Sequence, residues 1–344
     1  MTPPDRSLLG ALATEWGRLT GAPHEAPALR LMKVSSRPGR YLPMLFFLFR
    51  DGAASPSYAL KVNRDPSYPD AILREFRNYS AIWARGGEAD RGMPRPVFCE
   101  RIGEHVVLCE TYVGGRRCED RYFSVRRGRA RRKVLEQFLV AAVTWLREFH
   151  ARTRSAEGVI DAARVETQFQ QPLRAFAARA ETPAALAARL AAFAELLPRL
   201  VGRVAVRTAV HGDFDHGNIL IDGARISVVD WEDCEPAGNP LVDLTYLIVH
   251  LALVSDLDAA ADRRLEEFFA PGSWTLGLVR ALLTDYARGV GLEPDAFFLG
   301  LPGTVIEIMT KPWGVERDPR SIPVNSIDRL AFVTELATRE LRAA

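Results

Sequence analysis

The spacing of apolar residues in this sequence changes near Gly114 and Gly115. Before that point, the apolar residues between 29 and 108 fall in short runs: LRLMKV, MLFFLF, YALKV, VFC and HVVLCE. Short apolar runs bounded by Gly, Pro, Ser and Asp are typical of strands, and brief connections favour antiparallel pairing. The segment 70–87 instead repeats its apolar residues at helical spacing. We therefore predict a small antiparallel sheet of about five strands with one helix among them.

Beyond Gly115 the pattern predicts a mostly helical chain. The expected helices cover 133–150, two alanine-rich segments within 162–201, 240–254, 259–269, 274–290, 294–310 and 326–342. The exception is 204–231, where VAVRTAV, NILI and ARISVVD are typical of short strands. We expect an α+β protein with a strand-rich N-terminal domain, 1–113, and a larger helical domain, 114–344.

The composition excludes several classes of protein. Hydrophobic residues make up 48% of the chain and charged residues 26%, which indicates a folded globular protein. A net charge of +2 provides no overall field for nucleic acid or an anionic membrane, so any such preference must be local, and we expect no nucleic-acid partner. The four cysteines lack metal-ligand spacing, and no stretch has the character of a signal peptide or membrane span. A cytoplasmic protein is the expectation.

Polar residues gather at the ends of the strands predicted between 204 and 231. His211, Gly212 and Asp213 follow an apolar strand, Asn218 comes five residues after Asp213, and Asp230 ends another strand. Phosphoryl transfer needs a carboxylate to orient the attacking hydroxyl and oxygen ligands for Mg²⁺. The spacing therefore predicts Asp213 as the catalytic residue and Asn218 and Asp230 as magnesium ligands. An ordinary turn, with Asp and Asn as turn residues, is the alternative.

The stretch HGDFDHGN, with Asp230 and Trp231 after it, resembles the aminoglycoside phosphotransferase and choline kinase superfamily. The loop of that superfamily has the form HGDLHPGN, and its metal-binding Asp precedes Trp or Phe. The differences here, at 214–216, leave the catalytic positions unchanged. The resemblance implies a two-lobed, protein-kinase-like fold and an enzyme that transfers the γ-phosphate of ATP or GTP to a hydroxyl of a small molecule.

A kinase-like fold also requires a lysine for the nucleotide phosphates and a helical carboxylate to hold that lysine. Lys61 lies in YALKV, the third predicted strand, and Glu75 lies in the predicted helix. Only four of the 45 basic residues are lysines, so a lysine inside a strand suggests a need for a point charge. The simpler alternatives are an exposed edge strand for Lys61 and a solvated helix face for Glu75.

Three further residues are predicted to contact the nucleotide. The first hairpin contains SSRPGR and no GxGxxG, so Ser35 and nearby main-chain amides are expected to cover the phosphates. Adenine is expected to bond to main-chain groups of Glu110 and Tyr112, where the fifth strand leads toward the second domain. His150, at a helix end, and Asp243, near a helix start, are interpreted as structural supports of the catalytic loop.

The acceptor class is less constrained than the chemistry. Glu232, Asp233 and Glu235 could attract an aminoglycoside or a choline-like cation, although a solvated acidic loop is an equal alternative. The segment 121–133 holds seven basic residues and no acid, which suits a phosphorylated glycan, a lipid headgroup or RNA; a solvated, arginine-rich loop is the favoured alternative. The alternative functions are a catalytically silent nucleotide-binding scaffold of the same fold and, less favoured, a protein kinase.

Overall fold

The computed structural model describes most of the 344 residues. The described ranges are 3–22, 27–35, 43–65, 69–86, 92–117, 120, 128–223, 225–254, 261–310 and 324–343. They form two compact units, of which the first comprises Met1–Arg117 and Asn218–Pro236 and the second comprises Cys118–Gly217 and Ala237–Ala344. The domain division after residue 113 stays a prediction.

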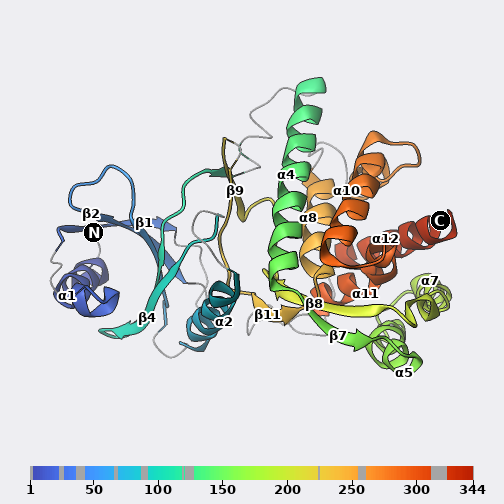
Figure 1. Ribbon diagram of the computed structural model, residues 1–344, viewed down its shortest axis with the longest axis horizontal. Helices are drawn as coiled ribbons and strands as arrows, with labels where there is room; N and C mark the ends of the chain where they lie inside the picture. Colours follow the sequence, from blue (N-terminus) through green and yellow to red (C-terminus); the bar gives the residue numbers. More distant parts are fainter. Residues whose placement is uncertain are drawn as a thin grey trace. The chain divides into compact units, whose positions relative to one another are not determined.

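The first unit is built on a five-stranded sheet, ordered β1-β2-β3-β5-β4, in which all neighbouring strands are antiparallel (Figure 1). Near the centre of the sheet, Lys61 of β3 pairs with Leu45 of β2 on one side and with Leu108 of β5 on the other. Lys61 therefore lies on a central strand, and the edge-strand alternative is wrong. The strands are β1 (Leu29–Ser35), β2 (Met44–Arg50), β3 (Tyr58–Val62), β4 (Pro96–Ile102) and β5 (His105–Thr111).

The two faces of this sheet are covered by different helices, α1 (Pro3–Thr20) and α2 (Asp70–Gly86) (Figure 1). Side chains alternate between the faces of a strand. Leu60 and Val62 of β3 accordingly pack with α1 in the larger apolar cluster. Val106 and Leu108 of β5 pack with α2 on the other face. Lys61, between Leu60 and Val62, must therefore point toward α2.

Helix α1 was not expected from the sequence, which predicted a single helix in this part of the chain. Its buried residues Leu8, Leu12, Trp16 and Leu19 recur every three or four positions and so form one apolar stripe. That stripe covers the sheet face opposite α2. The N-terminal sequence contains this periodic pattern of apolar residues. The pattern identifies a packed helix only once the structure shows a sheet face that the apolar stripe can cover.

A second, smaller sheet completes the first unit, in the order β10-β9-β6. Gly92 allows the chain to approach it, because a Cβ at that position would lie 1.9 Å from the carbonyl oxygen of Ile226. The Gly92 backbone also has φ +81° and accepts a hydrogen bond from the Val228 amide at 2.8 Å. The strands are β6 (Arg116–Arg117), β9 (Ile219–Asp222) and β10 (Arg225–Val228).

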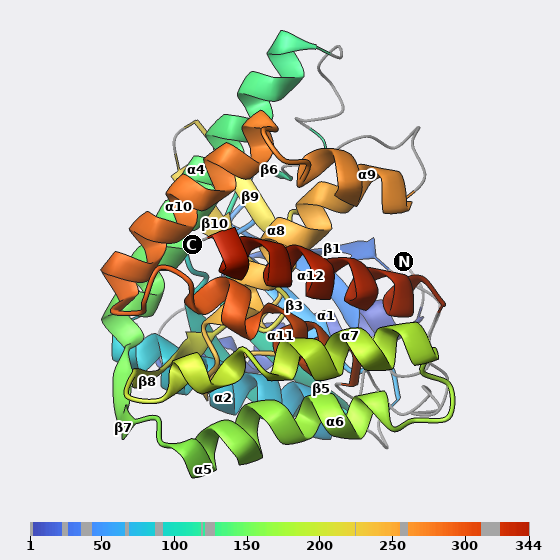
Figure 2. The ribbon, with the colours of Figure 1, turned by 90° about the vertical axis from the view of Figure 1, so that its right-hand side faces the viewer.

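The second unit is mainly helical and packs around α8 (Leu241–Val254), which is apolar and buried along nearly its whole length. Figures 1 and 2 show α4 and α10 side by side, and Figure 2 shows α6 and α7 running below α12. The other helices are α4 (Arg129–Thr153), α5 (Ala162–Val165), α6 (Gln171–Ala177), α7 (Ala184–Ala194), α9 (Ala261–Phe268), α10 (Trp274–Val290), α11 (Ala296–Thr310) and α12 (Val324–Ala343).

A three-stranded sheet, ordered β11-β8-β7, accompanies these helices. Its strands are β7 (Ser155–Val159), β8 (Val204–Val210) and β11 (Glu235–Gly238). Only β8 was expected from the sequence, because β7 and β11 are short and lack the apolar runs typical of strands. Among the helices that the structure describes, none combines the length and the apolar character needed to cross a bilayer.

Candidate active site

The ammonium group of Lys61 lies between two carboxylates of the first unit. Its Nζ donates to Glu75 Oε1 at 2.7 Å and to Asp230 Oδ1 at 2.5 Å. Burial alone would lower the pKa of Lys61, but the opposite charges of Asp230 and Glu75 raise it well above its ordinary value. Lys61 is therefore a fixed positive charge on the α2 face of the sheet.

Helix α2 presents Glu75 to this site because of its position on the buried face. Ile72, Glu75, Tyr79 and Ile82 are the buried residues of the helix, and they recur at helical spacing. The Glu75 side chain is only 2% exposed. A carboxylate this deeply buried requires a partner, and Lys61 supplies it. The solvated-face alternative for Glu75 is therefore wrong.

Asp230 belongs to a turn held rigidly by its neighbours. Its φ of +69° is left-handed, a conformation that only Asp51 shares among the described non-glycine residues. Trp231 is fully buried, stacks on Tyr79 at 5.0 Å between ring centroids, and donates from Nε1 to the Val228 carbonyl at 3.1 Å. The Asp230 side chain remains 43% exposed. The turn thus directs one carboxylate oxygen to Lys61 while leaving the group accessible to a ligand.

Asn218 is brought beside this turn by the backbone. The Val229 amide donates to the Asn218 carbonyl oxygen at 3.0 Å, next to the start of β9. Carboxylate and amide oxygens are suitable ligands for Mg²⁺, which proteins commonly bind through one or two carboxylates together with substrate phosphates. These residue types therefore fit a magnesium ion, with Asn218 and Asp230 as the predicted donors. Their role as ligands stays a prediction.

Glu110 and Tyr112 lie at the end of β5, where the adenine was predicted to bind. The main-chain amide of Tyr112 donates to the Ser57 carbonyl at 3.0 Å, so a nucleotide contact to that amide would require this bond to be replaced. Glu110 is 5% exposed, and in the described part of the chain its Oε2 has no hydrogen-bond partner. Burial raises the pKa of Glu110 to about 8.

This raised pKa predicts how a Glu110→Gln variant responds to pH. A carboxyl whose folded pKa exceeds its unfolded value of about 4.3 binds a proton on folding. The free energy of unfolding of the parent should therefore fall as the pH rises from about 4.3 to about 8, the pKa of Glu110 in the folded protein. We expect the free energy of unfolding of Glu110→Gln, relative to the parent, to increase over that window and to level off above it. Urea unfolding at several pH values measures it, with exposed Glu104→Gln as the control. A difference in the free energy of unfolding between Glu110→Gln and the parent that does not change with pH would contradict a raised pKa for Glu110.

The predicted phosphate-covering residues are only partly described. Ser35 is the last residue of β1, where it pairs with Leu45. The residues that follow it, 36–42, lie outside the described residues, as does most of the basic segment, 121–127. The remainder of that segment begins α4, where the Arg132 guanidinium lies 4.4 Å from the centroid of the Trp274 ring. The nucleotide-binding role of Ser35 stays a prediction.

The loop that contains Asp213, in the second unit, is held by one buried carboxylate. Asp243, in the first turn of α8, accepts hydrogen bonds from the amides of His211 and Gly212, both at 2.8 Å. The Asp213 amide in turn donates to His211 Nδ1 at 3.3 Å, and the Asp213 carbonyl accepts from the Asp215 amide at 2.9 Å. These bonds fix the backbone on both sides of Asp213, whose side chain is half-buried.

His150 supports this arrangement from the end of α4. Its Nε2 lies 3.1 Å from Asp243 Oδ2 and its Nδ1 lies 2.6 Å from the Tyr286 hydroxyl. Burial would raise the pKa of Asp243, but the bonds from His150 and from the His211 amide hold it below its ordinary value. The structural interpretation of His150 and Asp243 therefore agrees with the contacts that they make.

An Asp243→Asn variant is expected to be less stable than the parent at neutral pH by about 1–3 kcal/mol, because a buried amide loses its acceptor. A depressed folded pKa contributes stability that is present above the unfolded value of about 3.9 and is lost as the pH falls through the folded pKa. The gap should therefore narrow at acid pH. His150, His211 and Tyr286 are the titratable groups facing Asp243. Urea unfolding measures the gap, with exposed Asp328→Asn as the control; a gap that is unchanged or wider at acid pH would contradict the prediction.

Two features of the loop were not anticipated from its sequence. Phe214 is fully buried and stacks on Trp145 with ring centroids 5.5 Å apart. Asp215 accepts from the Gly217 amide at 2.7 Å and faces His250 of α8, whose Nδ1 lies 3.5 Å from Asp215 Oδ2. Residues that differ from the superfamily pattern thus anchor the loop to α4 and α8. Only the apolar character of Phe214 signalled this in the sequence.

The chain matches the model of the phosphotransferase enzyme family over residues 45–282. This match covers well over half of the sequence and includes Lys61, the catalytic loop and Asp230. The chain therefore belongs to the phosphotransferase enzyme family. No curated protein sequence matches it.

Solved structures show the same fold at low sequence identity. One is a thermostable mutant of the aminoglycoside phosphotransferase APH(4)-Ia in ternary complex with ADP and hygromycin B, with 13% identity and TM-score 0.52 over 97% of this chain and 99% of that one. A candidate fructosamine-3-kinase from Thermobifida fusca has 16% identity and TM-score 0.51 over 95% and 98%. The macrolide 2'-phosphotransferase MphH from Brachybacterium faecium has 16% identity and TM-score 0.50 over 87% and 90%. The predicted α+β, kinase-like fold is confirmed.

Proposed function

We propose that this protein transfers the γ-phosphoryl group of ATP to a hydroxyl group of a small molecule, in a reaction that depends on Mg²⁺. The observation that carries the proposal is the buried Lys61 ammonium between Glu75 and Asp230. A buried lysine with two acidic partners is costly to a protein unless its charge is used. Family membership supports phosphoryl transfer as that use.

The charges of the first unit suit a magnesium nucleotide. Lys61 would contact the α- and β-phosphates, with Glu75 holding its ammonium group in place. Asn218 and Asp230 would hold the magnesium ion, which when bound neutralises the negative charge of the phosphates. Main-chain groups near Glu110 and Tyr112, together with Ser35, are proposed to position the base and cover the phosphates. ATP is the first choice of nucleotide, with GTP as the alternative.

Asp213 is proposed as the group that orients the acceptor. Its carboxylate accepts the proton of the acceptor hydroxyl as the hydroxyl oxygen forms a bond to the γ-phosphorus. The bond from that phosphorus to the bridging oxygen breaks at the same time, and the nucleoside diphosphate leaves. The bonds from Asp243 to the loop amides support this role, because they hold the backbone before Asp213.

The acceptor is proposed to be an aminoglycoside, an amino alcohol, a sugar or a related natural product. Hygromycin B and ADP are the ligands of one structural neighbour, and another is a macrolide 2'-phosphotransferase. The acidic residues Glu232, Asp233 and Glu235 that follow the Asp230 turn suit an acceptor with a positive charge.

The test is an ADP-release assay with ATP and Mg²⁺ across aminoglycosides, amino alcohols, sugars and nucleosides. We expect ADP release that depends on one of these acceptor classes and is lost in Lys61→Met. Lys33→Met is the matched control, because Lys33 also lies in a strand of the same sheet but is exposed. Nucleotide binding without acceptor-dependent ADP release in any class would favour the silent scaffold instead.

A further inference from the structure

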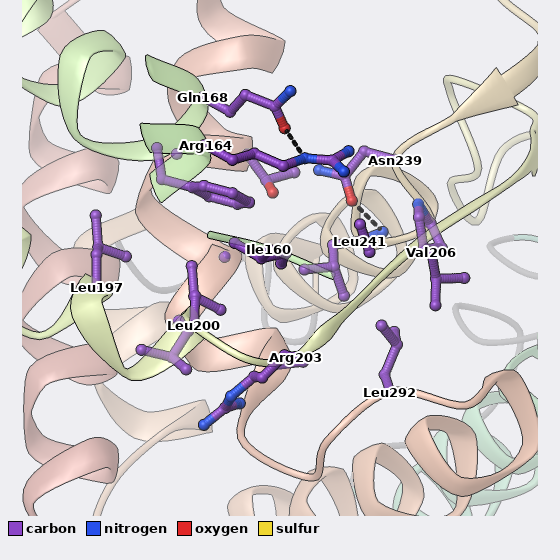
Figure 3. A pocket seen from close by; sticks show the side chains of 18 of the residues that line it. Ile160, Arg164, Gln168, Leu197, Leu200, Arg203, Val206, Asn239, Leu241 and Leu292 are labelled. Carbon is purple, nitrogen blue, oxygen red and sulfur yellow. Dashed lines mark hydrogen bonds between the residues drawn. The ribbon is translucent and has the colours of Figure 1, made fainter. Parts of the chain in front are cut away.

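The second unit contains a chamber of about 590 Å³ that the proposed reaction does not use. It is lined by residues from the region of α5 to β8, from the start of α8, and from α11 (Figure 3). Pockets of 300–1,000 Å³ with mostly apolar linings are the usual size for small-molecule sites. Figure 3 shows Leu197, Leu200, Ile160 and Val206 around the space, with Arg164 and its neighbours along one side.

Helix α11 contains Pro302, and the two residues after it, Gly303 and Thr304, line the chamber. Proline inside a helix removes a backbone hydrogen bond, and glycine there is less stable than alanine. Gly300, one turn earlier, is explained by packing, since a Cβ there would lie 2.3 Å from Leu241 Cδ1. At Gly303, by contrast, no heavy atom of the described residues lies within 4 Å of an added Cβ. Unlike Gly300, Gly303 is not needed to avoid a clash, and the absence of a side chain there enlarges the chamber.

Thr304 adds a polar group to the same wall. Its side chain is 2% exposed, and its hydroxyl has no hydrogen-bond partner in the described part of the chain. Helical threonines usually bond to the carbonyl four residues earlier, as Thr310 of the same helix does to Ile306 at 2.8 Å. A buried hydroxyl without a partner is costly, and such groups in folded proteins are commonly satisfied by a ligand or water.

The charged residues of the chamber balance one another. Arg203 pairs with Asp295, with 3.0 Å between Nη2 and Oδ2, and so points its charge out of the space. Arg164 donates from Nε to Gln168 Oε1 at 2.9 Å. The remaining charged lining residues are Arg207, Glu293 and Glu307, which leaves two positive and two negative side chains besides the Arg203 pair. This balance favours a neutral ligand over an ion.

We propose that this chamber binds a small, neutral, lipophilic molecule that carries a hydrogen-bonding oxygen. The apolar body lies among the leucine, isoleucine and valine side chains, in the space that Gly303 leaves open. The ligand oxygen accepts a hydrogen bond from the Thr304 hydroxyl, which must rotate toward the chamber because its oxygen is itself buried in this structure. The site is separate from the catalytic loop, because its lining lies within 160–207 and 239–310. Arg207, the lining residue that most closely precedes the loop in sequence, comes before His211 by about 13 Å of extended strand.

The test measures binding of Prodan, a neutral naphthalene fluorophore with one ketone oxygen, to the full chain without nucleotide. We expect saturable binding of one equivalent with a blue-shifted emission. Gly303→Leu should weaken it by about tenfold or more, because the new side chain occupies the ligand's space. Gly277→Leu is the matched control, since Gly277 is also inside a helix with open space around it but lies outside the chamber.

Thr304→Val tests the polar contact without changing the shape of the wall. It should weaken Prodan binding by about twofold to tenfold, the usual effect of one hydrogen bond. The affinity for 2-propylnaphthalene, which lacks the oxygen and is measured by displacement of Prodan, should be the same in Thr304→Val as in the parent. Absence of saturable binding to the parent would overturn the proposal, as would equal binding by parent and a folded Gly303→Leu protein. If Gly303→Leu does not fold, Thr304→Val decides, and equal binding of Prodan to it and to the parent overturns the proposal. Because these readouts need no catalysis, they are independent of the proposed function.

Discussion

An Asp213→Asn variant is expected to turn over about 10² to 10⁴ times more slowly than the parent, with nucleotide affinity retained. The amide cannot accept the proton of the acceptor hydroxyl, whereas the loop backbone remains held by Asp243 and His211. The measurement is kcat from steady-state ADP release, together with nucleotide binding by titration calorimetry. Nucleotide affinity and turnover should respond differently, because the group proposed to bind the nucleotide phosphates is Lys61 of the first unit and not Asp213.

The control for this variant is Asp222→Asn, which makes the same chemical change at an exposed position at the end of β9. It should leave both kcat and nucleotide affinity at the values of the parent. Loss of nucleotide binding together with unfolding in Asp213→Asn would identify Asp213 as a structural turn residue. Unchanged kcat in Asp213→Asn would remove it from the mechanism.

Asp230→Asn is expected to reduce turnover by at least about 10³, because a metal ion stabilises several kcal/mol of transition-state charge and each 1.36 kcal/mol is tenfold in rate. Asparagine is the appropriate substitution, since the φ of +69° at this position is tolerated best by Gly, Asn and Asp. Lys61 would keep Glu75 as its partner. Titrating Mg²⁺ in the nucleotide-binding assay should show that the variant needs a higher Mg²⁺ concentration than the parent to reach the same nucleotide affinity, because a neutral amide oxygen is a weaker ligand for Mg²⁺ than a carboxylate.

Glu235→Gln serves as the control, because it neutralises an exposed carboxylate five residues further on. It should retain the magnesium dependence of nucleotide binding seen in the parent. A magnesium titration of Asp230→Asn that matches that of the parent, with turnover near that of the parent, would show that the carboxylate does not contribute to the metal site.

Much of the fold could be predicted because its signals are local. The expected 274–290 helix coincides with α10, and Ser273 caps it by accepting from the Leu276 amide at 3.1 Å. The strand YALKV coincides with β3. Such elements are specified by the spacing of apolar residues and by the residues at their ends, which the sequence displays directly.

Other parts depended on contacts between distant residues. Helix α1 has a periodic apolar stripe, yet its place is set by a sheet face that β2, β3 and β5 complete later in the chain. The stack of Tyr79 on Trp231 and the pairing of Asp215 with His250 likewise join segments that no short window of sequence contains. The chamber beside Gly303 has the same origin, since helices and strands from widely separated parts of the chain form its walls.

The sequence by itself determined which residue types are available for phosphoryl transfer and the spacing of Asp213, Asn218 and Asp230, because motif and strand periodicity are short-range properties. Alternation along β3 also required Lys61 to point away from Leu60 and Val62. Only the tertiary structure decided that this direction leads to Glu75 and Asp230, since sheet order and helix placement follow from burying apolar surface across the whole first unit. The charge of Lys61 therefore follows from the sequence, and its partners follow from the packing of the sheet against α2.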